Sequence, residues 1–197
     1  MSSRSGQRYD DDNKRIVTGT IPFRIITESD NNTNNKEETK VVNNKTPSSS
    51  KVGNELIELL VVTCRRKKEK RTFPKGGWEL DDEDLEHGAR RETLEEAGVS
   101  SALKLIKVNK NEITPSWEYL SKKKKNGNND VKEQERGCTA HMFLMRVTEM
   151  HDIWLEDKNR IREWVSPARA KNILKEDWMK DALQTALDQN LFSSSHI

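Results

Sequence analysis

Short apolar runs alternate with polar stretches along this chain, and most of the runs have the length of strands. The β-branched residues at 15–26 predict a first strand, in which Pro22 indicates an edge or a bulge because proline cannot donate a ladder hydrogen bond. Further strands are predicted at residues 56–64, 103–108, 117–120, 138–147 and 161–165.

Helical patterns follow at residues 84–97, 167–175 and 177–189. In the first of these, Asp81 or Asp82 could cap the start, and Gly98 suits a left-handed stop. Its predicted inner stripe consists of Leu85, Ala89, Thr93 or Leu94, and Ala97. Strands around one central helix, with another helix near the end, predict an α/β (α+β) sandwich with a mixed central sheet and helices outside.

Polar stretches divide the chain without breaking it into several domains. We expect one domain at 14–190, with a disordered insertion at 28–55 that is rich in Asn, Ser, Lys and Glu. A second polar loop is expected at 121–137, and disordered ends at 1–13 and 191–197. Loop-closure entropy grows slowly with length, so a long insertion between two strands is tolerable.

Composition narrows the class of protein. Hydrophobic residues make up 32% of the chain and charged residues 35%, and the net charge of +2 gives no reason to expect nucleic acid as a partner. The two cysteines lack the paired spacing of a zinc site or a disulfide framework, which favours reduced thiols in an intracellular protein. Without a membrane-length apolar run or a signal-peptide pattern, we expect a cytoplasmic or nuclear protein, with mitochondria as the alternative.

Three glutamates, Glu92, Glu95 and Glu96, fall on one face of the first predicted helix. Like charges at this spacing destabilise an isolated helix, whereas clustered carboxylates are suitable ligands for Mg²⁺. Gly76 and Gly77 lie just upstream and would let backbone carbonyls approach closely. Taken alone, the glutamates favour the reading of a solvated acidic face, which charge runs usually form.

The surrounding spacing resembles the Nudix box, G-x5-E-x7-R-E-U-x-E-E-x-G-U, where U is bulky and apolar. Gly77, Glu83 and the run RETLEEAGV at 91–99 match it, and Thr93 at the first U is a departure that bears on packing. The stretches FPKGGWE, WEYLSK, MFLMRVTE, E-x-x-NR-x-R-x-W-V and DWMKDAL are similar to the plant branch of this superfamily. That branch is similar to diphosphoinositol polyphosphate phosphohydrolases and diadenosine polyphosphate hydrolases.

The resemblance implies a role for each matched residue. Glu92, Glu96 and the Gly76 carbonyl would hold Mg²⁺ or Mn²⁺, and Glu95 would take a proton from the attacking water. The residues expected to brace the loop and helix are Gly77, Glu83, Arg91 and Gly98. The implied reaction is metal-dependent hydrolysis of a phosphoanhydride bond.

A polyphosphate substrate also needs basic side chains, and we expect Lys75, Arg15 and Arg65 to supply them. Trp78, beside the glycines, could stack near the substrate. The expected substrate is a small diphosphoinositol or diadenosine polyphosphate. Two alternatives stay open: an ADP-ribose or NADH pyrophosphatase, for which Pro115 is weak support, and a non-catalytic Nudix-fold module that binds RNA or protein.

Overall fold

A mixed sheet forms the middle of the molecule. The computed structural model describes residues 6–26, 51–52, 55–65, 67–109, 116–122 and 135–193. In these residues the main sheet contains β1 (Arg15–Ile26), β2 (Lys51–Val52), β3 (Glu55–Thr63), β4 (Arg71–Thr72), β5 (Lys75–Gly77), β7 (Ile106–Val108), β8 (Trp117–Lys122), β9 (Glu135–Arg146) and β11 (Arg162–Val165). A small second sheet pairs β6 (Val99–Ser100) with β10 (Glu149–Met150). The helices are α1 (Leu85–Ala97), α2 (Pro167–Ile173) and α3 (Asp177–Asp188).

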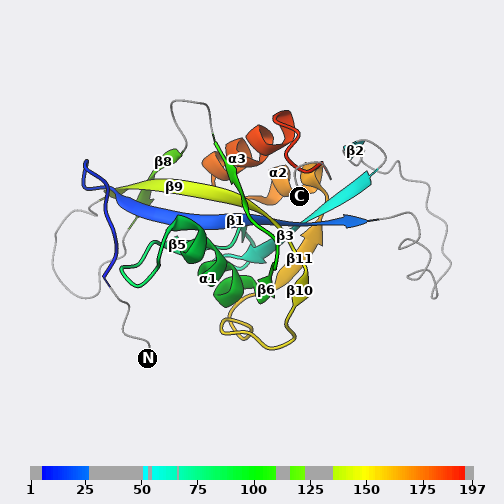
Figure 1. The fold of residues 1–197 in the computed structure, drawn as a ribbon, viewed down its shortest axis with the longest axis horizontal. Helices are drawn as coiled ribbons and strands as arrows, with labels where there is room; N and C mark the ends of the chain where they lie inside the picture. Colours follow the sequence, from blue (N-terminus) through cyan, green and yellow to red (C-terminus); the bar gives the residue numbers. More distant parts are fainter. Residues whose placement is uncertain are drawn as a thin grey trace.

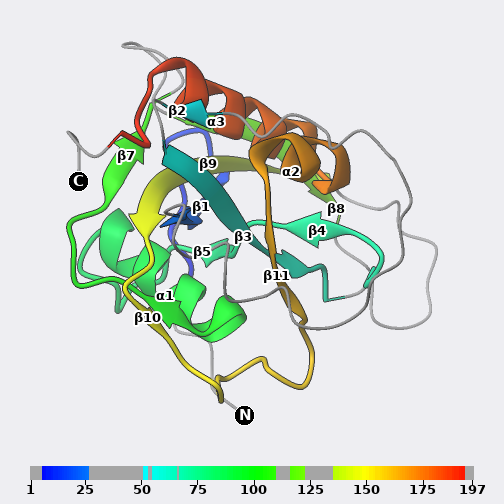
Figure 2. The ribbon, with the colours of Figure 1, turned by 90° about the vertical axis from the view of Figure 1, so that its right-hand side faces the viewer.

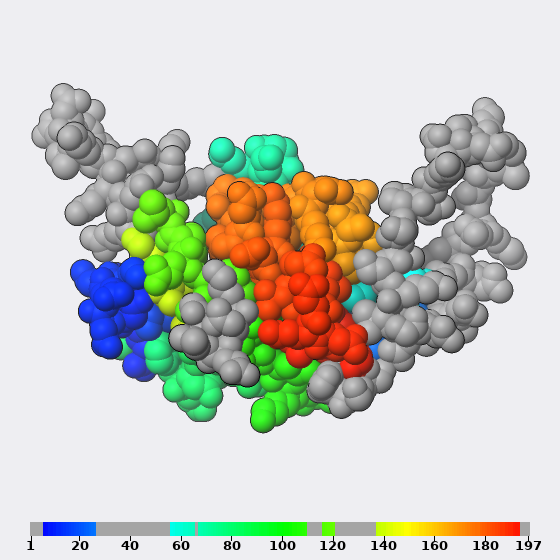
Figure 3. All heavy atoms as spheres, turned by 90° about the horizontal axis from the view of Figure 1, so that it is seen from above, coloured from blue at the N-terminus to red at the C-terminus, as the bar shows by residue number. Residues whose placement is uncertain are grey.

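The helices cover opposite faces of the sheet. The main strand order is β11-β3-β1-β9-β7, with α1 on one face and α2 and α3 on the other (Figure 1, Figure 2). Figure 3 looks onto the face that α2 and α3 cover. The predicted α/β sandwich with a mixed sheet is therefore confirmed. In the described part of the chain, no helix is long and apolar enough to cross a membrane.

Strand β1 lies in the centre of the sheet, so the edge position predicted from Pro22 is wrong. On one side β1 runs parallel to β9, from Arg15 opposite Cys138 to Phe23 opposite Arg146. On the other side its partner changes, from β5 up to Gly19 to β3 from Phe23 onward. Pro22 falls at this change of partner, where its missing N–H interrupts neither ladder.

The apolar core is unequal on the two faces. A large cluster joins the sheet to α2 and α3, and includes Val17, Ile21, Phe23, Leu59, Met142, Trp178, Met179 and Leu183. The α1 face has two small clusters instead: Leu60, Val62, Ala97 and Val99 form one, and Ala89, Leu105, Phe143 and Met145 form the other. Burial on the α2 and α3 side therefore contributes most of the hydrophobic stabilisation, which leaves room for polar groups under α1.

Helix α1 begins and ends at polar and glycine signals close to those expected. Asp84, rather than Asp81 or Asp82, is the N-cap and accepts a hydrogen bond from the His87 amide at 2.7 Å. Gly98 ends the helix in the left-handed conformation, with φ at 61°.

Thr93, rather than Leu94, faces the sheet from α1. Its hydroxyl donates to the Ala89 carbonyl at 2.7 Å and lies 2.7 Å from the Thr20 hydroxyl. Because Thr93 uses its proton on Ala89, Thr20 is the donor of the second bond. Leu94 is 44% exposed. Thr93, a polar residue where the motif has an apolar one, thus has its hydroxyl hydrogen-bonded to the hydroxyl of Thr20.

The two ends of the described chain are more ordered than the sequence indicates. Residues 6–8 contact the loop before α1, and Gln7 forms a β-bridge with Glu79. Near the other end, Phe192 is fully buried and meets Phe23 edge-to-face, with ring centroids 5.1 Å apart. An isolated apolar or basic residue in a polar segment carries no periodic signal, so neither contact was foreseen.

The two polar segments reach into strands at their margins. Lys51 and Val52 pair with β3, although the expected insertion at 28–55 included them. The strands β8 and β9 likewise extend to Lys122 and Glu135, inside the expected loop at 121–137. Residues 27–50, 53–54 and 123–134 lie outside the described residues, so the rest of both predictions stays a prediction.

We predict that Phe192→Ala lowers the free energy of unfolding by about 3–5 kcal/mol, because it removes a buried aromatic ring. Urea denaturation measures this loss as a lower midpoint. The matched control is Ile153→Ala, since Ile153 is 84% exposed and should change stability by less than about 0.5 kcal/mol. Equal stability of the two variants would contradict the anchoring of the C-terminal segment.

Candidate active site

The three glutamates lie together on helix α1, next to strand β5. Glu92 and Glu96 are each 9% exposed and lie one turn apart on the inner side of the helix. Glu95 lies beside them with its side chain 38% exposed. The acidic face is therefore mostly buried, which does not fit the reading of it as a solvated surface.

Glu92 packs directly on the backbone of β5. A Cβ atom on Gly76 would lie 2.0 Å from Glu92 Oε1, so only glycine lets the carboxylate come this close. The pKa of Glu92 is raised to about 7, first by burial and then by the charge of Glu96, although Arg91 opposes the shift. Arg91 Nη1 donates to Glu92 Oε1 at 3.0 Å.

Glu96 is held by two partners from outside the helix. The backbone amide of Lys75 donates to Oε2 at 3.1 Å, and Arg160 Nη2 donates to Oε1. Burial raises the pKa of Glu96, and the charges of Lys75 and Arg160 oppose this. Arg160 is itself buried and also contacts Glu156 and the Thr63 carbonyl.

Arg91 joins the helix to the loop before it. Its Nε and Nη2 donate to the two carboxylate oxygens of Asp82 at 2.8 and 2.9 Å, and Nη2 also donates to the Gly77 carbonyl at 3.0 Å. Burial by itself would raise the pKa of Asp82, but the bonds from Arg91 and from the Glu79 amide lower it. This bidentate pair braces the loop against α1.

Glu83 does not make the bracing contact with Arg91 that the resemblance implies for it. Its side chain is exposed, and Asp82, one residue earlier and 2% exposed, makes the ion pair with Arg91. Gly88 allows this, because a Cβ there would lie 2.9 Å from Asp82 Oδ2. The motif spacing selected Glu83, and spacing alone carries no information on which of two neighbouring acidic side chains is buried.

The C-terminal end of α1 is fixed by Arg162. Its Nη1 donates to the carbonyls of Ala97, Gly98 and His151 at 2.8 to 3.2 Å, which satisfies helix-terminal acceptors. The guanidinium also lies over the Trp154 ring, 4.3 Å from its centroid. The segment that carries Arg160 and Arg162 thus holds both Glu96 and the end of its helix.

Cationic groups gather beside Glu96 at the end of β3. Arg160 donates to the Thr63 carbonyl at the end of β3 at 2.9 Å. Burial raises the pKa of the neighbouring Cys64 thiol, and the charges of Lys175, Lys75 and Arg160 oppose that shift. Arg65 follows Cys64, is 60% exposed and reaches Glu156 at 3.9 Å. Of the basic residues in this group, sequence reasoning missed Lys175 and Arg160.

Arg15 and Trp78 have other surroundings. Arg15 begins β1 opposite Cys138, and its charge acts on Tyr119. Trp78 carries the guanidinium of Arg8 on its ring, at 4.4 Å from the centroid. The contacts of these two residues therefore differ from those of Lys75, whose amide touches Glu96.

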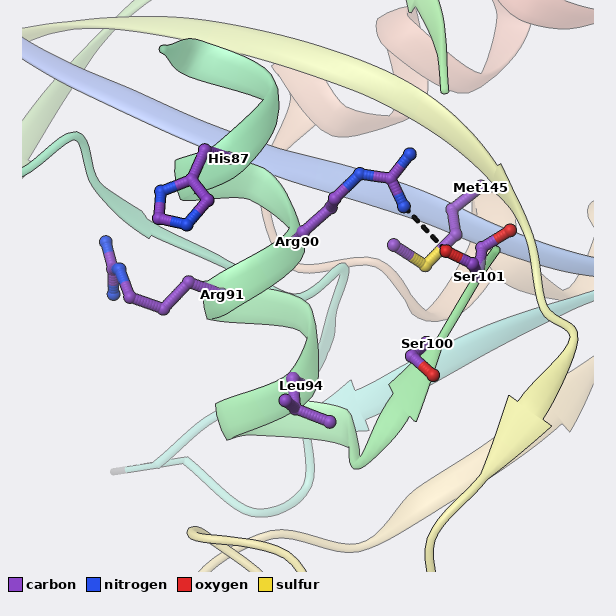
Figure 4. Close-up of a pocket in the computed structure, with 7 residues that line it drawn as sticks. All are labelled: His87, Arg90, Arg91, Leu94, Ser100, Ser101 and Met145. Carbon is purple, nitrogen blue, oxygen red and sulfur yellow. Dashed lines mark hydrogen bonds between the residues drawn. The ribbon is translucent and has the colours of Figure 1, made fainter. Parts of the chain in front are cut away.

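A hollow of about 330 Å³ lies on the outer side of α1 (Figure 4). It is lined by His87, Arg90, Arg91, Leu94, Ser100, Ser101 and Met145. Figure 4 shows Arg90 turned toward Ser101 and Arg91 turned the other way. Neither Glu92 nor Glu96 lines this hollow, so it is separate from the buried carboxylates.

The carboxylates suit a hard divalent cation. Two buried glutamates with raised pKa values repel each other, and a bound cation would relieve this. Among the described residues, no three His, Cys, Asp or Glu side chains already form a metal-binding cluster. Glu92 and Glu96 are instead paired with Arg91 and Arg160, so binding a cation would require these contacts to rearrange.

Known proteins resemble this chain over most of its length. Residues 53–186 match the family model of the NUDIX domain. "Nudix hydrolase 12, mitochondrial" from Arabidopsis thaliana is 35% identical over 196 residues, covering 95% of this chain and 80% of that protein. "Nudix hydrolase 21, chloroplastic" from the same plant is 30% identical, covering 96% and 76%.

Solved structures show the same fold at low sequence identity. A NUDIX hydrolase from Nitrosomonas europaea has a TM-score of 0.53 and 14% identity, covering 93% of this chain and 95% of that one. The C. elegans Ap4A hydrolase binary complex has a TM-score of 0.50 and 16% identity, covering 89% and 96%. The arrangement of sheet and helices is therefore shared well beyond the short motif.

We predict that Asp82→Asn lowers the free energy of unfolding by about 2–3 kcal/mol, because it leaves the Arg91 guanidinium without its bidentate charged partner. Chemical denaturation at pH 7 measures the loss. Glu83→Gln is the matched control and should change stability by less than about 0.5 kcal/mol. A larger loss in Glu83→Gln than in Asp82→Asn would assign the brace to Glu83 instead.

A second prediction concerns pH. The folded-state pKa of Glu92, about 7, lies above its ordinary value of 4.5. Between these pH values the folded protein holds a proton that the unfolded chain releases, so Glu92 destabilises the metal-free protein as pH rises through this window. We therefore expect Glu92→Gln to be more stable than the unsubstituted protein at pH 8 in EDTA, by up to about 3 kcal/mol.

The measurement is the difference between the two proteins in urea denaturation at pH 5 and pH 8. The difference is needed because burial lowers the pKa of His141 to about 4, which makes stability rise with pH over an overlapping window. His141 is present in both proteins, so its effect cancels. A stability difference that does not grow between pH 5 and pH 8 would contradict the raised pKa of Glu92.

Proposed function

This chain belongs to the Nudix hydrolase family, and from this premise we propose that it hydrolyses a phosphoanhydride bond in a diphosphoinositol or diadenosine polyphosphate. Hydrolysis of a phosphoanhydride by the family's chemistry follows from membership. The choice of a densely phosphorylated small molecule is our proposal. The observation that carries it is the pair of basic residues at the buried carboxylate of Glu96: Lys75 donates its backbone amide to it, and Arg160, which also bonds the Thr63 carbonyl at the end of β3, donates its guanidinium.

Nudix hydrolases generally use divalent metals, and here the donor set suits Mg²⁺ or Mn²⁺. Glu92, Glu96 and the Gly76 carbonyl would hold the ion. When bound, it would neutralise non-bridging phosphate oxygens and make water more acidic. The glycine at position 76 matters because its missing Cβ lets Glu92 reach the backbone of β5.

Glu95 is the proposed base for the attacking water. Its carboxylate is more exposed than those of Glu92 and Glu96, and it lies 3.5 Å from Arg91 Nη1. A water that gives its proton to Glu95 forms a new bond to phosphorus, and the bond from that phosphorus to the bridging oxygen breaks. The leaving phosphate keeps the bridging oxygen, and the proton ultimately passes to product or solvent.

The cations suit a substrate with several phosphates. Lys75 and Arg160 contact Glu96, and Arg65 reaches Glu156, which also pairs with Arg160. The charge of Lys175 opposes the raised pKa of Cys64. Phosphate groups are well matched by arginine forks and lysine point charges. Arg15 lies near Tyr119, and we propose that it contacts a more distant phosphate of the same substrate.

The alternatives have less support. Pro115, the residue that favoured ADP-ribose or NADH, lies outside the described residues. A pure binding module would gain nothing from burying two neighbouring glutamates whose pKa values are raised by desolvation. As to location, several relatives carry the word mitochondrial in their names, so we keep mitochondria beside cytoplasm and nucleus as a proposed compartment.

We expect the purified protein with Mg²⁺ or Mn²⁺ to hydrolyse a diphosphoinositol or diadenosine polyphosphate faster, in kcat/KM, than ADP-ribose or NADH. Phosphorus NMR of the products identifies the bond that breaks. Glu95→Gln should lower kcat by about 100-fold or more, because the attacking water loses its proton acceptor. Preference for ADP-ribose or NADH would support the alternative enzyme class.

The matched control is Glu86→Gln. Glu86 lies on the same helix but pairs with Arg90 on the outer side, so its substitution should leave kcat nearly unchanged. Glu95→Gln with full activity, or a wild-type protein that turns over none of these substrates with either metal, would overturn the proposal.

A further inference from the structure

The N-terminal strap, defined here as Gly6–Lys14, lies along the loop that leads into α1. The Arg8 amide donates to the Trp78 carbonyl at 2.9 Å, and the Leu80 amide donates to the Gly6 carbonyl at 2.9 Å. Between these bonds, Gln7 and Glu79 form an antiparallel bridge. The strap therefore supplies backbone partners to the loop segment 78–80, which continues β5 toward the brace at Asp82.

The Arg8 side chain makes three further contacts with the same loop. Its Nε donates to the Glu79 carbonyl at 3.2 Å, and its Nη2 donates to the Leu80 carbonyl at 3.1 Å. Its guanidinium lies over the Trp78 ring, 4.4 Å from the centroid. One planar side chain thus spans three consecutive loop residues, which a lysine could not do because it lacks the fork geometry.

The strap also packs on the glycine that carries the Arg91 contact. A Cβ on Gly77 would lie 1.8 Å from Gln7 Oε1, so Gln7 and Gly77 are in direct contact. The Gly77 carbonyl accepts from Arg91, while Gly76 contacts Glu92. The loop is held between the strap on one side and α1 on the other.

The base of the strap is fixed to the sheet. The Lys14 amide donates to Asp10 Oδ1 at 2.8 Å, and the Asp10 amide donates to the Lys14 carbonyl at 2.9 Å, closing a tight turn. Thr139 on β9 donates its hydroxyl to Asp10 Oδ2 at 2.6 Å. This turn gives the strap a rigid support, so a contact made by Arg8 can fix the loop's position.

We propose that the strap is part of the active-site architecture and that Arg8 is a positioning residue, which acts by holding residues 76–82 in register with α1. Its effect on turnover rests on the proposed function; its effect on cation binding does not. Loss of Arg8 displaces the Gly76 carbonyl relative to Glu92, and the cation site loses one of its ligands. The sequence alone did not indicate this, because the segment was expected to be disordered.

The test compares Arg8→Ala with Arg24→Ala. Arg24 is a matched control because its guanidinium also lies over a tryptophan, 4.5 Å from the Trp164 centroid, and also pairs with a partner on a neighbouring strand, Glu58. Arg24 lies about 20 Å along β1 from Thr18, the residue that pairs with Gly76. Both variants remove one arginine–tryptophan contact, but only Arg8→Ala touches the loop.

Binding of Mn²⁺ without substrate, followed by electron paramagnetic resonance, is the first readout. We expect Arg8→Ala to weaken Mn²⁺ binding about 10-fold or more, as loss of supporting contacts around metal ligands does. Hydrogen exchange is the second readout, and the amides of Trp78 and Leu80 should exchange faster in this variant. Arg24→Ala should match the wild type in both, whatever its change in melting temperature.

The outcomes separate this inference from the proposed function. Wild-type protein that binds Mn²⁺ but hydrolyses none of the polyphosphates would overturn the proposed substrate, while weaker Mn²⁺ binding by Arg8→Ala would still support the strap. Unchanged Mn²⁺ binding in Arg8→Ala would overturn the inference, even if the loop amides exchange faster. So would equal weakening in Arg24→Ala, or a wild-type protein that takes up no Mn²⁺.

Discussion

The burial of two like charges next to each other is the constraint on which this structure depends. Glu92 and Glu96 lie one turn apart under α1, where desolvation disfavours their ionised forms. Folding is possible because each carboxylate has an arginine partner, Arg91 from the helix itself and Arg160 from the segment before β11. Removing Arg160 would leave Glu96 as an uncompensated buried charge, whereas Arg91 keeps Asp82 as a charged partner when Glu92 is neutralised.

The rest of the fold compensates for this polar region. The face of the sheet under α2 and α3 carries the large apolar cluster, whereas the α1 face mixes small apolar clusters with hydroxyls and carboxylates. Helix α1 is held by polar contacts both along its length and at its C-terminal end. Arg162 satisfies its last carbonyls, and the Asp82–Arg91 pair joins its outer side to the loop before it. The face under α2 and α3 thus contributes most of the stability, and the face under α1 carries the candidate active site.

The sequence predicted the parts of the molecule that repeat or that follow fixed spacing. The strands at β1, β3 and β9, the helix α1 and its Gly98 stop follow from periodicity and from turn residues. The clustering of the glutamates follows from helical geometry. The glycine at position 76 suggested a close approach to the backbone, because glycine lacks a Cβ. These inferences succeeded because each rests on neighbours in the chain.

The sequence did not indicate contacts between individual residues that lie far apart in the chain. Asp82 and Glu83 differ by one position, and only the packing against Gly88 and Arg91 shows which is buried. Arg160 lies 64 residues from Glu96 in the chain, and its position in a recognisable motif said nothing about the side chain it would contact. Arg8 and Phe192 sit in polar segments without periodicity, so their contacts appear only once the sheet is assembled.

The change of partner along β1 has a further consequence. The first half of this strand pairs with β5, which carries Gly76, and the second half pairs with β3 beyond Phe23. Figure 1 shows the end of β1 and the short β2 on the side of the molecule away from β5. The length of one strand thus separates the candidate active site from the end of β1, by about 25 Å between Thr18 and Ile26. We therefore expect an affinity handle or a fluorophore attached at Ile26 to leave the proposed reacting groups in place.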